Sequence, residues 1–324
     1  MASSRLYRDG TLLLEDFPVD DVSEHLTEPG VTIWVDLKAS DQGTLDQVAL
    51  ELGIHEIALE NATAGGQRPK IDRYADHAFL AAYALRLDQE SGQLDTSALT
   101  AFVTSQTVVT VRQDDVIDVK EVKSRWDGNP DLASSGVAYL LWGLLDYLVD
   151  NHFDVVQQLG DAIESVEDQL FEAHPKGVAV LQRRLYGLRR SLVTLRRDVL
   201  PMREVVNTLM RRDLPFVSDA MLPYYQDVYD HVLRATEWTE SLRDLVTTVL
   251  ETNLTLQGNR MNLIMKKVTS WAAIIAVPTA ITGYYGQNLP YPGFGQEWGW
   301  IASSAVIAVA SVLLYATFKR ADWL

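Results

Sequence analysis

The chain has 324 residues and no cysteine, which excludes disulfide bonds and thiolate metal sites. Its 28 Lys and Arg residues are outnumbered by 44 Asp and Glu residues, so the formal net charge is −16 at pH 7. Because nucleic acids are bound by clustered positive side chains, this balance argues against a nucleic-acid partner. An acidic balance of this kind suits a protein that attracts cations, or one that simply stays soluble.

The first 133 residues have the mixed pattern of an α/β domain. The stretch Val31–Leu37 alternates and is rich in β-branched residues, and His77–Asp88 and Ala98–Gln113 also have the composition of strands. The stretch Thr44–Ile54 has the apolar spacing of a helix. We therefore predict a cytosolic α/β head over residues 1–133.

Residues 134–267 have the pattern of long helices with few breaks. One helix is predicted from about Ser134 to Ala173 and a second from about Val178 to Met210. A third begins near Asp219 and has no stop signal before the apolar C-terminal region. At about 1.5 Å per residue, this helix would be on the order of 100 Å long with that region included. Such a length predicts a helical stalk over residues 134–267.

Two uncharged segments near the C-terminus are long enough to cross a bilayer. Neither Val268–Gln296 nor Trp298–Phe318 contains a charged residue. A helix needs about 20 apolar residues to span the hydrocarbon core. We therefore predict transmembrane helices over residues 268–286 and 298–318, joined by a loop over residues 287–297.

The orientation of these two spans follows from the basic residues beside them. These residues are Arg260, Lys266, Lys267, Lys319 and Arg320. The connecting loop has neither Lys nor Arg, so the positive-inside rule places it outside the cell. Both termini, including the basic tail at residues 319–324, are then expected in the cytosol. We therefore expect a multi-pass protein of the cell membrane.

One face of the first span, continued into the helix before it, carries mostly small or polar residues at heptad spacing. This seam consists of Asn262, Met265, Thr269, Ala272, Ala276, Thr279, Gly283 and Gly286. The seam could form a close contact between helices, or it could line a water-filled axis. Two spans in one chain enclose a pore only in a homo-oligomer. The amides of Gln287 and Asn288 favour the pore, because with the Gly286 carbonyl they would form a polar ring on its axis.

Several segments resemble the CorA family of magnesium channels. They are Met261–Asn288, the loop and second span that follow, Lys319–Leu324, Leu195–Glu204, Tyr224–His231 and Gln67–Lys70. The resemblance covers essentially the whole chain. It implies a homopentamer in which the first span lines one pore and the stalk helices form a cytosolic funnel. It also implies uptake of Mg²⁺, and of Co²⁺ and Ni²⁺, driven by the membrane potential.

The resemblance also assigns the pore residues. The family's Gly-Met-Asn signature falls on Gly286, Gln287 and Asn288, with Gln in place of Met. Contact with the hydrated ion is implied for the Asn288 side chain and the Gly286 carbonyl. Mg²⁺ gives up its waters reluctantly, and a neutral polar ring can bind those waters without removing them. The seam positions implied to line the pore are Asn262, Met265, Thr269, Ala276 and Thr279.

Three residues around the pore qualify this assignment. Ala276 stands where family members often have a bulky residue, so the gate is expected at other positions, Met265 and Val268. Glu297 in the loop would concentrate cations at the outer mouth. The Gln287 substitution keeps a rival function open, namely a proton-coupled Zn²⁺ or Ni²⁺ transporter on the same scaffold.

The family is also gated by cytosolic Mg²⁺ bound between subunits. The ligand on the stalk matches Asp227, and the Leu-Glu-Asp segment of the head corresponds here to Leu59, Glu60 and Asn61. Because Asn is neutral, it is a weaker Mg²⁺ ligand than Asp. We therefore expect a weaker sensor, or Glu60 as the ligand from the head. Mg²⁺ is thus expected as both transported and regulatory ion, with no organic cofactor.

Signals of enzymatic chemistry are missing from the sequence. The six histidines are scattered, and none belongs to a His-Glu-x-x-His pair. The sequence has no phosphate-binding loop and no nucleophile elbow. We therefore expect no enzymatic activity, and we expect the partners to be other copies of the chain, the lipid bilayer and divalent cations.

Overall fold

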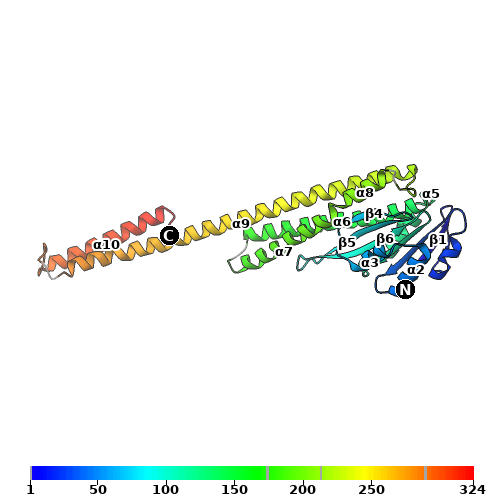
Figure 1. The fold of residues 1–324 in the computed structure, drawn as a ribbon. Helices are drawn as coiled ribbons and strands as arrows, with labels where there is room; N and C mark the ends of the chain where they lie inside the picture. Colours follow the sequence, from blue (N-terminus) through cyan, green and yellow to red (C-terminus); the bar gives the residue numbers. More distant parts are fainter. Residues whose placement is uncertain (1, 173–174, 212–213, 288–289) are drawn as a thin grey trace. The chain divides into compact units, whose positions relative to one another are not determined.

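The structure is a computed structural model that describes residues 2–172, 175–211, 214–287 and 290–324 (Figure 1). The chain divides into two compact units, Met1–Thr248 and Val249–Leu324. The long helix α9 (Leu222–Tyr285) contributes residues to both units.

The first unit is built on a mixed seven-stranded sheet with the strand order β2-β1-β3-β7-β6-β5-β4. The strands are β1 (Ser3–Arg8), β2 (Thr11–Glu15), β3 (Val31–Lys38), β4 (Lys70–Arg73), β5 (Ala78–Leu87), β6 (Leu94–Val103) and β7 (Thr107–Arg112). Strands β3 and β7 are parallel, and the other neighbours in this order are antiparallel. The three stretches predicted to form strands supply β3, β5, β6 and β7.

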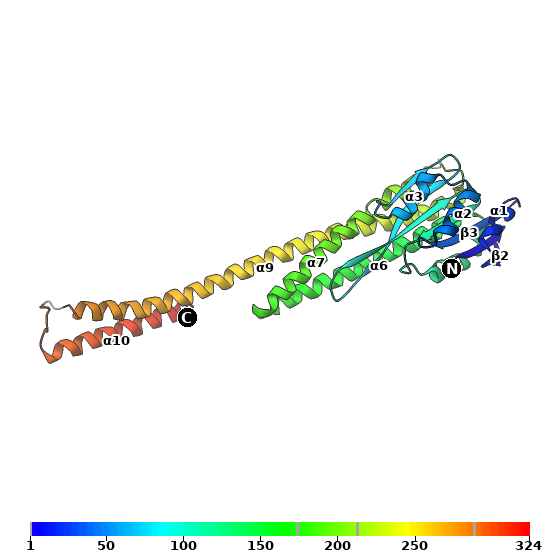
Figure 2. The same ribbon diagram turned by 60° about the horizontal axis from the view of Figure 1, so that its bottom comes forward.

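The sheet is covered on both faces because side chains alternate along each strand. On β3, Ile33 and Val35 enter the core on one face, and Trp34 enters the core on the other. The first face is covered by α2 (Gln42–Leu52) and α3 (Glu56–Ala64). Figure 2 shows these two helices beside the sheet.

The second face of the sheet is covered by several helices. These are α4 (Val119–Asp127), α6 (Val137–Glu172), α8 (Met202–Met210) and the first part of α9. Short helices complete the unit: η1 (Val19–Asp21), α1 (Val22–His25), α5 (Pro130–Ala133) and η2 (Asp219–Met221). As a result, α3 and α9 pack on opposite faces of the sheet.

Strand β4 pairs only with the first four residues of β5, from Ala78 to Ala81. Beyond them, side chains of α6 bind the backbone groups of β5 that β4 does not reach. The amide of Asn151 binds both backbone groups of Leu85, at 2.7 and 3.0 Å. Nε2 of the neighbouring His152 lies 2.7 Å from the Tyr83 carbonyl oxygen. Unpaired backbone groups of a buried strand are costly, so these two side chains fix α6 against the sheet.

The helical part of the first unit differs from the prediction at one point. A single helix is predicted from Val178 to Met210, but the structure has two, α7 (Pro175–Val199) and α8. The break falls at Pro201, which has no N–H to donate and whose ring crowds the preceding turn. The last hydrogen bond of the first helix runs from the Leu200 N–H to the Arg196 carbonyl, and Pro201 caps the next helix.

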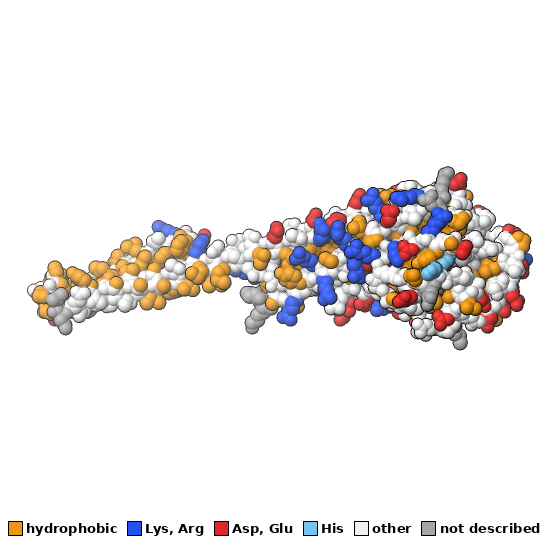
Figure 3. Space-filling model, in the orientation of Figure 1, with side chains coloured by type: hydrophobic (Ala, Val, Ile, Leu, Met, Phe, Trp, Pro, Cys, Tyr) orange, Lys and Arg blue, Asp and Glu red, His pale blue; other side chains and the backbone are white. Residues whose placement is uncertain are grey.

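The second unit consists of the remainder of α9 and of α10 (Glu297–Arg320), which lie side by side (Figures 1 and 2). Two helical segments, Asp219–Tyr285 and Glu297–Arg320, are long and apolar enough to cross a membrane. Their most apolar stretches are 6% and 0% buried, so these stretches are not core helices of a soluble domain. On the face that Figure 3 shows, most of this unit carries hydrophobic and uncharged side chains, and charged side chains appear at the end away from the connection between α9 and α10.

Candidate ion pathway and regulatory residues

The eight seam residues are all exposed in the chain. The buried and half-buried side of the same helix lies at other heptad positions, including Ser270, Ala273, Ile274, Val277 and Ile281. Since α10 lies alongside this part of α9, the second set is the face that packs within the unit. The small residues of the seam therefore do not serve a contact with the chain's own second span.

The end of the seam at Gly286 coincides with the C-terminal end of α9. The Gly286 N–H donates to the Thr282 carbonyl at 2.8 Å, and the Gln287 N–H donates to the Tyr284 carbonyl at 3.3 Å. Both Gly286 and Gln287 are exposed, whereas Asn288 lies outside the described residues. The last carbonyls of a helix have no partner within it and carry partial negative charge. This end of α9 thus presents an electrostatic environment that favours a cation.

The segment that returns from α9 to α10 is tightly turned. Gly293 has a φ of +90° and lies so close to α10 that a Cβ on Gly299 would meet the Gly293 carbonyl oxygen at 2.4 Å. Tyr291 packs edge-on against both Tyr285, at 4.9 Å, and Phe294, at 5.3 Å between ring centroids. The exposed Glu297 is the first residue of α10, where a carboxylate also favours the start of the helix.

The other end of the seam, at Asn262, opens into a hollow of about 550 Å³ within the second unit. It is lined by the seam residues Asn262, Met265 and Thr269 together with Asn259, Leu263, Lys266 and Trp323. The Lys266 ammonium lies 5.9 Å from the centre of the Trp323 ring, within the range of a cation–π contact. The sequence analysis did not anticipate Trp323 in this position.

A Schellman motif at the end of α10 explains how Trp323 comes to lie there. Asp322 has a φ of +54°, the Trp323 N–H donates to the Phe318 carbonyl at 2.9 Å, and the Asp322 N–H donates to the Lys319 carbonyl at 3.4 Å. The rings of Phe318 and Trp323 stack at 5.7 Å, which is the apolar contact that accompanies this motif. In the sequence, the signal for this motif is the aromatic pair Phe318 and Trp323, five positions apart at the end of the predicted helix.

The residues of the expected regulatory site lie on opposite faces of the sheet. Asp227 is on α9 with 67% of its side chain exposed, and His231 Nε2 lies 4.0 Å from its Oδ1. Glu60 and Asn61 are on α3, and Glu60 is exposed. The Asn61 Oδ1 accepts a hydrogen bond of 2.7 Å from Gln67 Nε2. Within one chain the sheet separates Asp227 from Glu60, so a site that uses both needs two chains.

Among the residues that the structure describes, the carboxylates of a single chain do not gather into a metal site. In the ranges that the structure describes, no group of three or more His, Asp or Glu side chains is arranged to hold a metal ion. Asp198, in the segment that resembles the family, is fully buried, and its Oδ1 lies 3.5 Å from Arg197 Nε. Burial raises the pKa of Asp198, and the contact with Arg197 opposes this effect. Asp198 is therefore closed to ions from solvent.

Comparison with known proteins gives a consistent result. The model of the family described as CorA-like Mg²⁺ transporter protein matches residues 30–320. The cobalt/magnesium transport protein CorA of Thermotoga maritima is 29% identical over 315 residues, which are 95% of this chain and 89% of the relative. A zinc transport protein, ZntB of Yersinia pestis, is more distant, with 23% identity over 83% of this chain and 81% of the relative.

The fold agrees with that of a solved relative. The complete structure of the CorA magnesium transporter from Methanocaldococcus jannaschii matches with a TM-score of 0.80 and 20% sequence identity, over 100% of this chain and 99% of that one. The predicted α/β head, long helix and two C-terminal apolar helices are thus confirmed. With the family model matching most of its length, the chain belongs to the family of CorA-like Mg²⁺ transporter proteins.

Proposed function

We propose that this protein is a divalent cation channel that carries Mg²⁺, and also Co²⁺ and Ni²⁺, into the cell. The observation that carries the proposal is the exposed seam on α9, which is turned away from the packing face of the same helix. A polar, small-residue face is costly in lipid, and several copies meeting at their seams would turn it toward a water-filled axis. The acidic chain and the neutral seam together suit cations that enter with their waters.

The proposed assembly is a homopentamer with one central pore. Its number of subunits rests on the resemblance to the family, and the two spans of each chain are too few to enclose a pore alone. Both termini lie in the cytosol and the loop at residues 287–297 lies outside, as the basic residues beside the spans predict. The domain boundaries proposed from the sequence give a head (1–133), a stalk (134–267), spans at 268–286 and 298–318, and a tail (319–324).

The proposed path of the ion begins at the C-terminal end of α9. The Gly286 carbonyl and the amides of Gln287 and Asn288 bind the waters of a hydrated ion. The ion then follows Thr279, Ala276 and Thr269 to Met265 and Asn262 at the inner hollow. An inside-negative potential drives this passage, at about 2.3 kcal/mol per elementary charge and 100 mV, and so about twice that for Mg²⁺.

Regulation by cytosolic Mg²⁺ is proposed to occur between neighbouring subunits. Asp227 of one chain and Glu60 of the next would bind the ion, which suits the exposure of both side chains and their positions on opposite faces of the sheet. The oxygen of Asn61 is already engaged by Gln67, which supports Glu60 rather than Asn61 as the ligand from α3. Mg²⁺ prefers such oxygen ligands and keeps several waters.

Ion flux in proteoliposomes tests the proposed function. Vesicles containing the full chain and an ion-sensitive dye are exposed to Mg²⁺, Co²⁺, Ni²⁺ or Zn²⁺, first under an imposed membrane potential and then under a pH gradient. Entry of Mg²⁺ that follows the potential and ignores the pH gradient supports the channel. Entry of Zn²⁺ that requires the pH gradient would replace it with the proton-coupled transporter.

The outer polar ring is tested by Asn288→Ala. Loss of the side-chain amide should abolish selective Mg²⁺ entry, because water-binding oxygens are removed from the narrow mouth. Gln296→Ala, which changes an amide in the same loop beyond the ring, is the matched control and should leave entry unchanged. Normal flux and ion preference in the Asn288 variant would refute the assigned role.

A further inference from the structure

A second polar hollow, of about 370 Å³, lies in the first unit, away from the candidate pore residues. Four arginines line it: Arg68 before β4, Arg196 and Arg197 on α7, and Arg243 on α9. Its other lining residues are Val193, Thr194, Leu200 and Pro201, and none is acidic. The chain has a net charge of −16, so a hollow lined by four arginines and no acidic residue is locally of the opposite charge.

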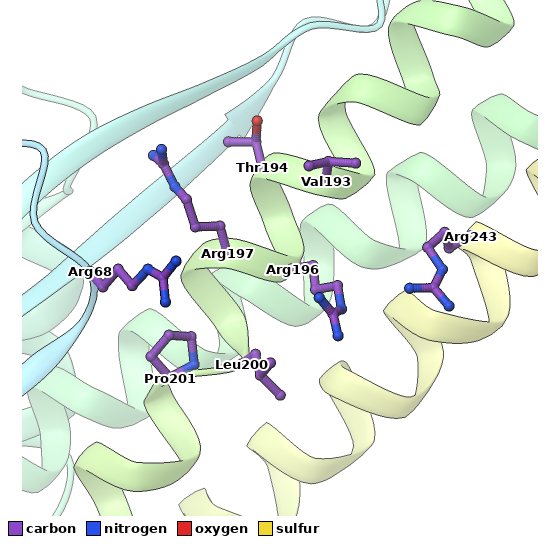
Figure 4. A pocket seen from close by; sticks show the side chains of 8 residues that line it. All are labelled: Arg68, Val193, Thr194, Arg196, Arg197, Leu200, Pro201 and Arg243. Carbon is purple, nitrogen blue, oxygen red and sulfur yellow. The ribbon is translucent and has the colours of Figure 1, made fainter.

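The positions of the side chains show how the arginines are held. In Figure 4, Arg196 and Arg243 reach toward each other from α7 and α9, while Arg68 reaches toward α7 from the opposite side. The Glu240 carboxylate pairs with both Arg196 and Arg243, the latter at 3.0 Å, and so fixes these two groups side by side. Each guanidinium has five N–H donors, so most of them stay available.

The positive charge of the hollow is only partly compensated within the chain. Glu240 balances one arginine, and Asp244 lies 3.6 Å from Arg243. Asp198 lies 3.5 Å from Arg197, but the Asp198 carboxyl group is buried, whereas the Arg197 side chain is half exposed. Among the described residues Arg68 makes no ion pair and no side-chain hydrogen bond. Arg68 thus adds an unpaired positive charge to the hollow, and an anion bound there would reduce the repulsion among the arginines that line it.

The shape and lining of the hollow indicate the class of anion. Guanidinium forks match the oxygens of phosphate groups in paired hydrogen bonds. At about 30 Å³ per water molecule, the volume equals that of about twelve waters, which exceeds the need of one phosphate. The exposed side chains of Val193 and Leu200 offer an apolar surface for an organic part of the ligand.

We propose that this arginine hollow binds a soluble organic anion with two or more phosphate groups, of the nucleoside polyphosphate class. Arg68, Arg196 and Arg243 hold the phosphates, and Val193, Leu200 and Pro201 contact the remainder. The proposal does not depend on ion transport, because the lining residues lie outside the two predicted spans and binding is measured without flux.

Calorimetric titration of the full chain in detergent, with a metal chelator present, tests the proposal. ATP and pyrophosphate should bind, and higher salt should weaken both. Adenosine, which has no phosphate, should not bind. Glycerol phosphate represents the single phosphate of a lipid headgroup and should bind more weakly than pyrophosphate. Absence of ATP binding, or equal binding of adenosine or of glycerol phosphate, would overturn the assignment.

Matched variants decide whether the hollow is the place of binding. Arg68→Gln and Arg243→Gln should each lower the affinity for ATP by about tenfold or more, because each removes charged hydrogen bonds to phosphate. Arg190→Gln removes an exposed arginine of α7 that does not line the hollow, so it should leave the affinity unchanged. Equal losses in all three variants would mean non-specific attraction.

Light scattering on the same variants separates the phosphate from a rival occupant. Carboxylates of a neighbouring copy could also pair with these arginines. In that case Arg68→Gln would lower the mass of the assembly, and ATP would not bind to the unmodified protein. An unchanged mass together with the loss of ATP affinity is the result that we expect.

Discussion

At the scale of single residues, the regulatory assignment depends on which oxygens are free. The side-chain oxygen of Asn61 accepts an internal hydrogen bond from Gln67 Nε2, whereas Glu60 and Asp227 are exposed. A carboxylate also binds Mg²⁺ more strongly than a neutral amide does. Because Asn61 stands where the family is expected to have Asp, we propose the neighbouring Glu60 as the Mg²⁺ ligand from α3.

Asp227→Ala should weaken inhibition of flux by cytosolic Mg²⁺, and the inhibition curve should move several-fold to higher concentration. The reason is that one of two carboxylates is lost from a site between chains. Asp230→Ala is the matched control, since Asp230 is an exposed acid one turn along the same helix. Vesicles with Mg²⁺ set on the cytosolic side give the measurement, and identical curves for both variants would contradict the role.

The pKa of His152, on α6, determines how this group contributes to the stability of the first unit as the pH changes. Burial lowers its pKa from 6.5 to about 4 in the folded chain, so the unfolded chain binds a proton first as the pH falls. Stability from this group is present above pH 6.5 and is lost as the pH falls toward about 4, by on the order of 3 kcal/mol in total.

Thermal unfolding of the His152→Gln variant checks this expectation. Glutamine keeps an N–H group that can donate to the Tyr83 carbonyl, but it has no titratable ring. The variant should lose less of its Tm on acidification than the unmodified protein does. Parallel curves of Tm against pH would show that another group governs acid sensitivity.

At the scale of elements, α9 has two different faces within the predicted membrane region. The face with Ser270, Ile274 and Val277 packs within the unit, and the face with Thr269, Ala276 and Thr279 is exposed. This division excludes only one form of the helix–helix contact that the sequence left open, the contact with the chain's own second span. A pore assembly would bring the seams of different chains together around its axis, so a contact between chains is compatible with a pore.

Ala276→Met tests the seam as a pore lining. A longer side chain on each copy should narrow the axis and reduce Mg²⁺ flux at least several-fold. Val312→Met provides the control, because Val312 is 66% exposed on α10, a helix that the proposed ion path does not include. If both variants conduct like the unmodified protein, residue 276 does not line the pathway.

At the scale of the whole molecule, the proposed pentamer is the expectation with the largest consequence. Light scattering of the detergent-solubilised protein, corrected for bound detergent, should give a protein mass five times that of the 36.3 kDa chain. A monomer or dimer at concentrations that support flux would exclude a pore lined by five seams. A monomer would also exclude the proposed regulatory site, because that site needs two neighbouring subunits.

Much of the architecture could be predicted because its signals are local. The alternation in Val31–Leu37, the uncharged segments and the heptad spacing of the seam each lie within a short stretch of chain. These features determined the strands, the two membrane helices and the seam. The break at Pro201 was also local, and the prediction of one continuous helix gave too little weight to the missing N–H of proline.

Short strands were harder to predict because their partners define them. Every residue of β2 is exposed and β4 has only four residues, so neither shows a buried pattern of its own. Each is a strand because a neighbouring strand binds its backbone. Sequence periodicity cannot show such pairing.

Composition and spacing along the chain show which segments are apolar, where charge flanks them and which residues share one side of a helix. The folded chain is needed to show that the seam is turned from α10, that the sheet separates Asp227 from Glu60, and that Asn61 is engaged by Gln67. It also brought together Arg68, Arg196 and Arg243 from three distant segments. The physical reason is that composition and periodicity act along the chain, whereas packing and charge act through space.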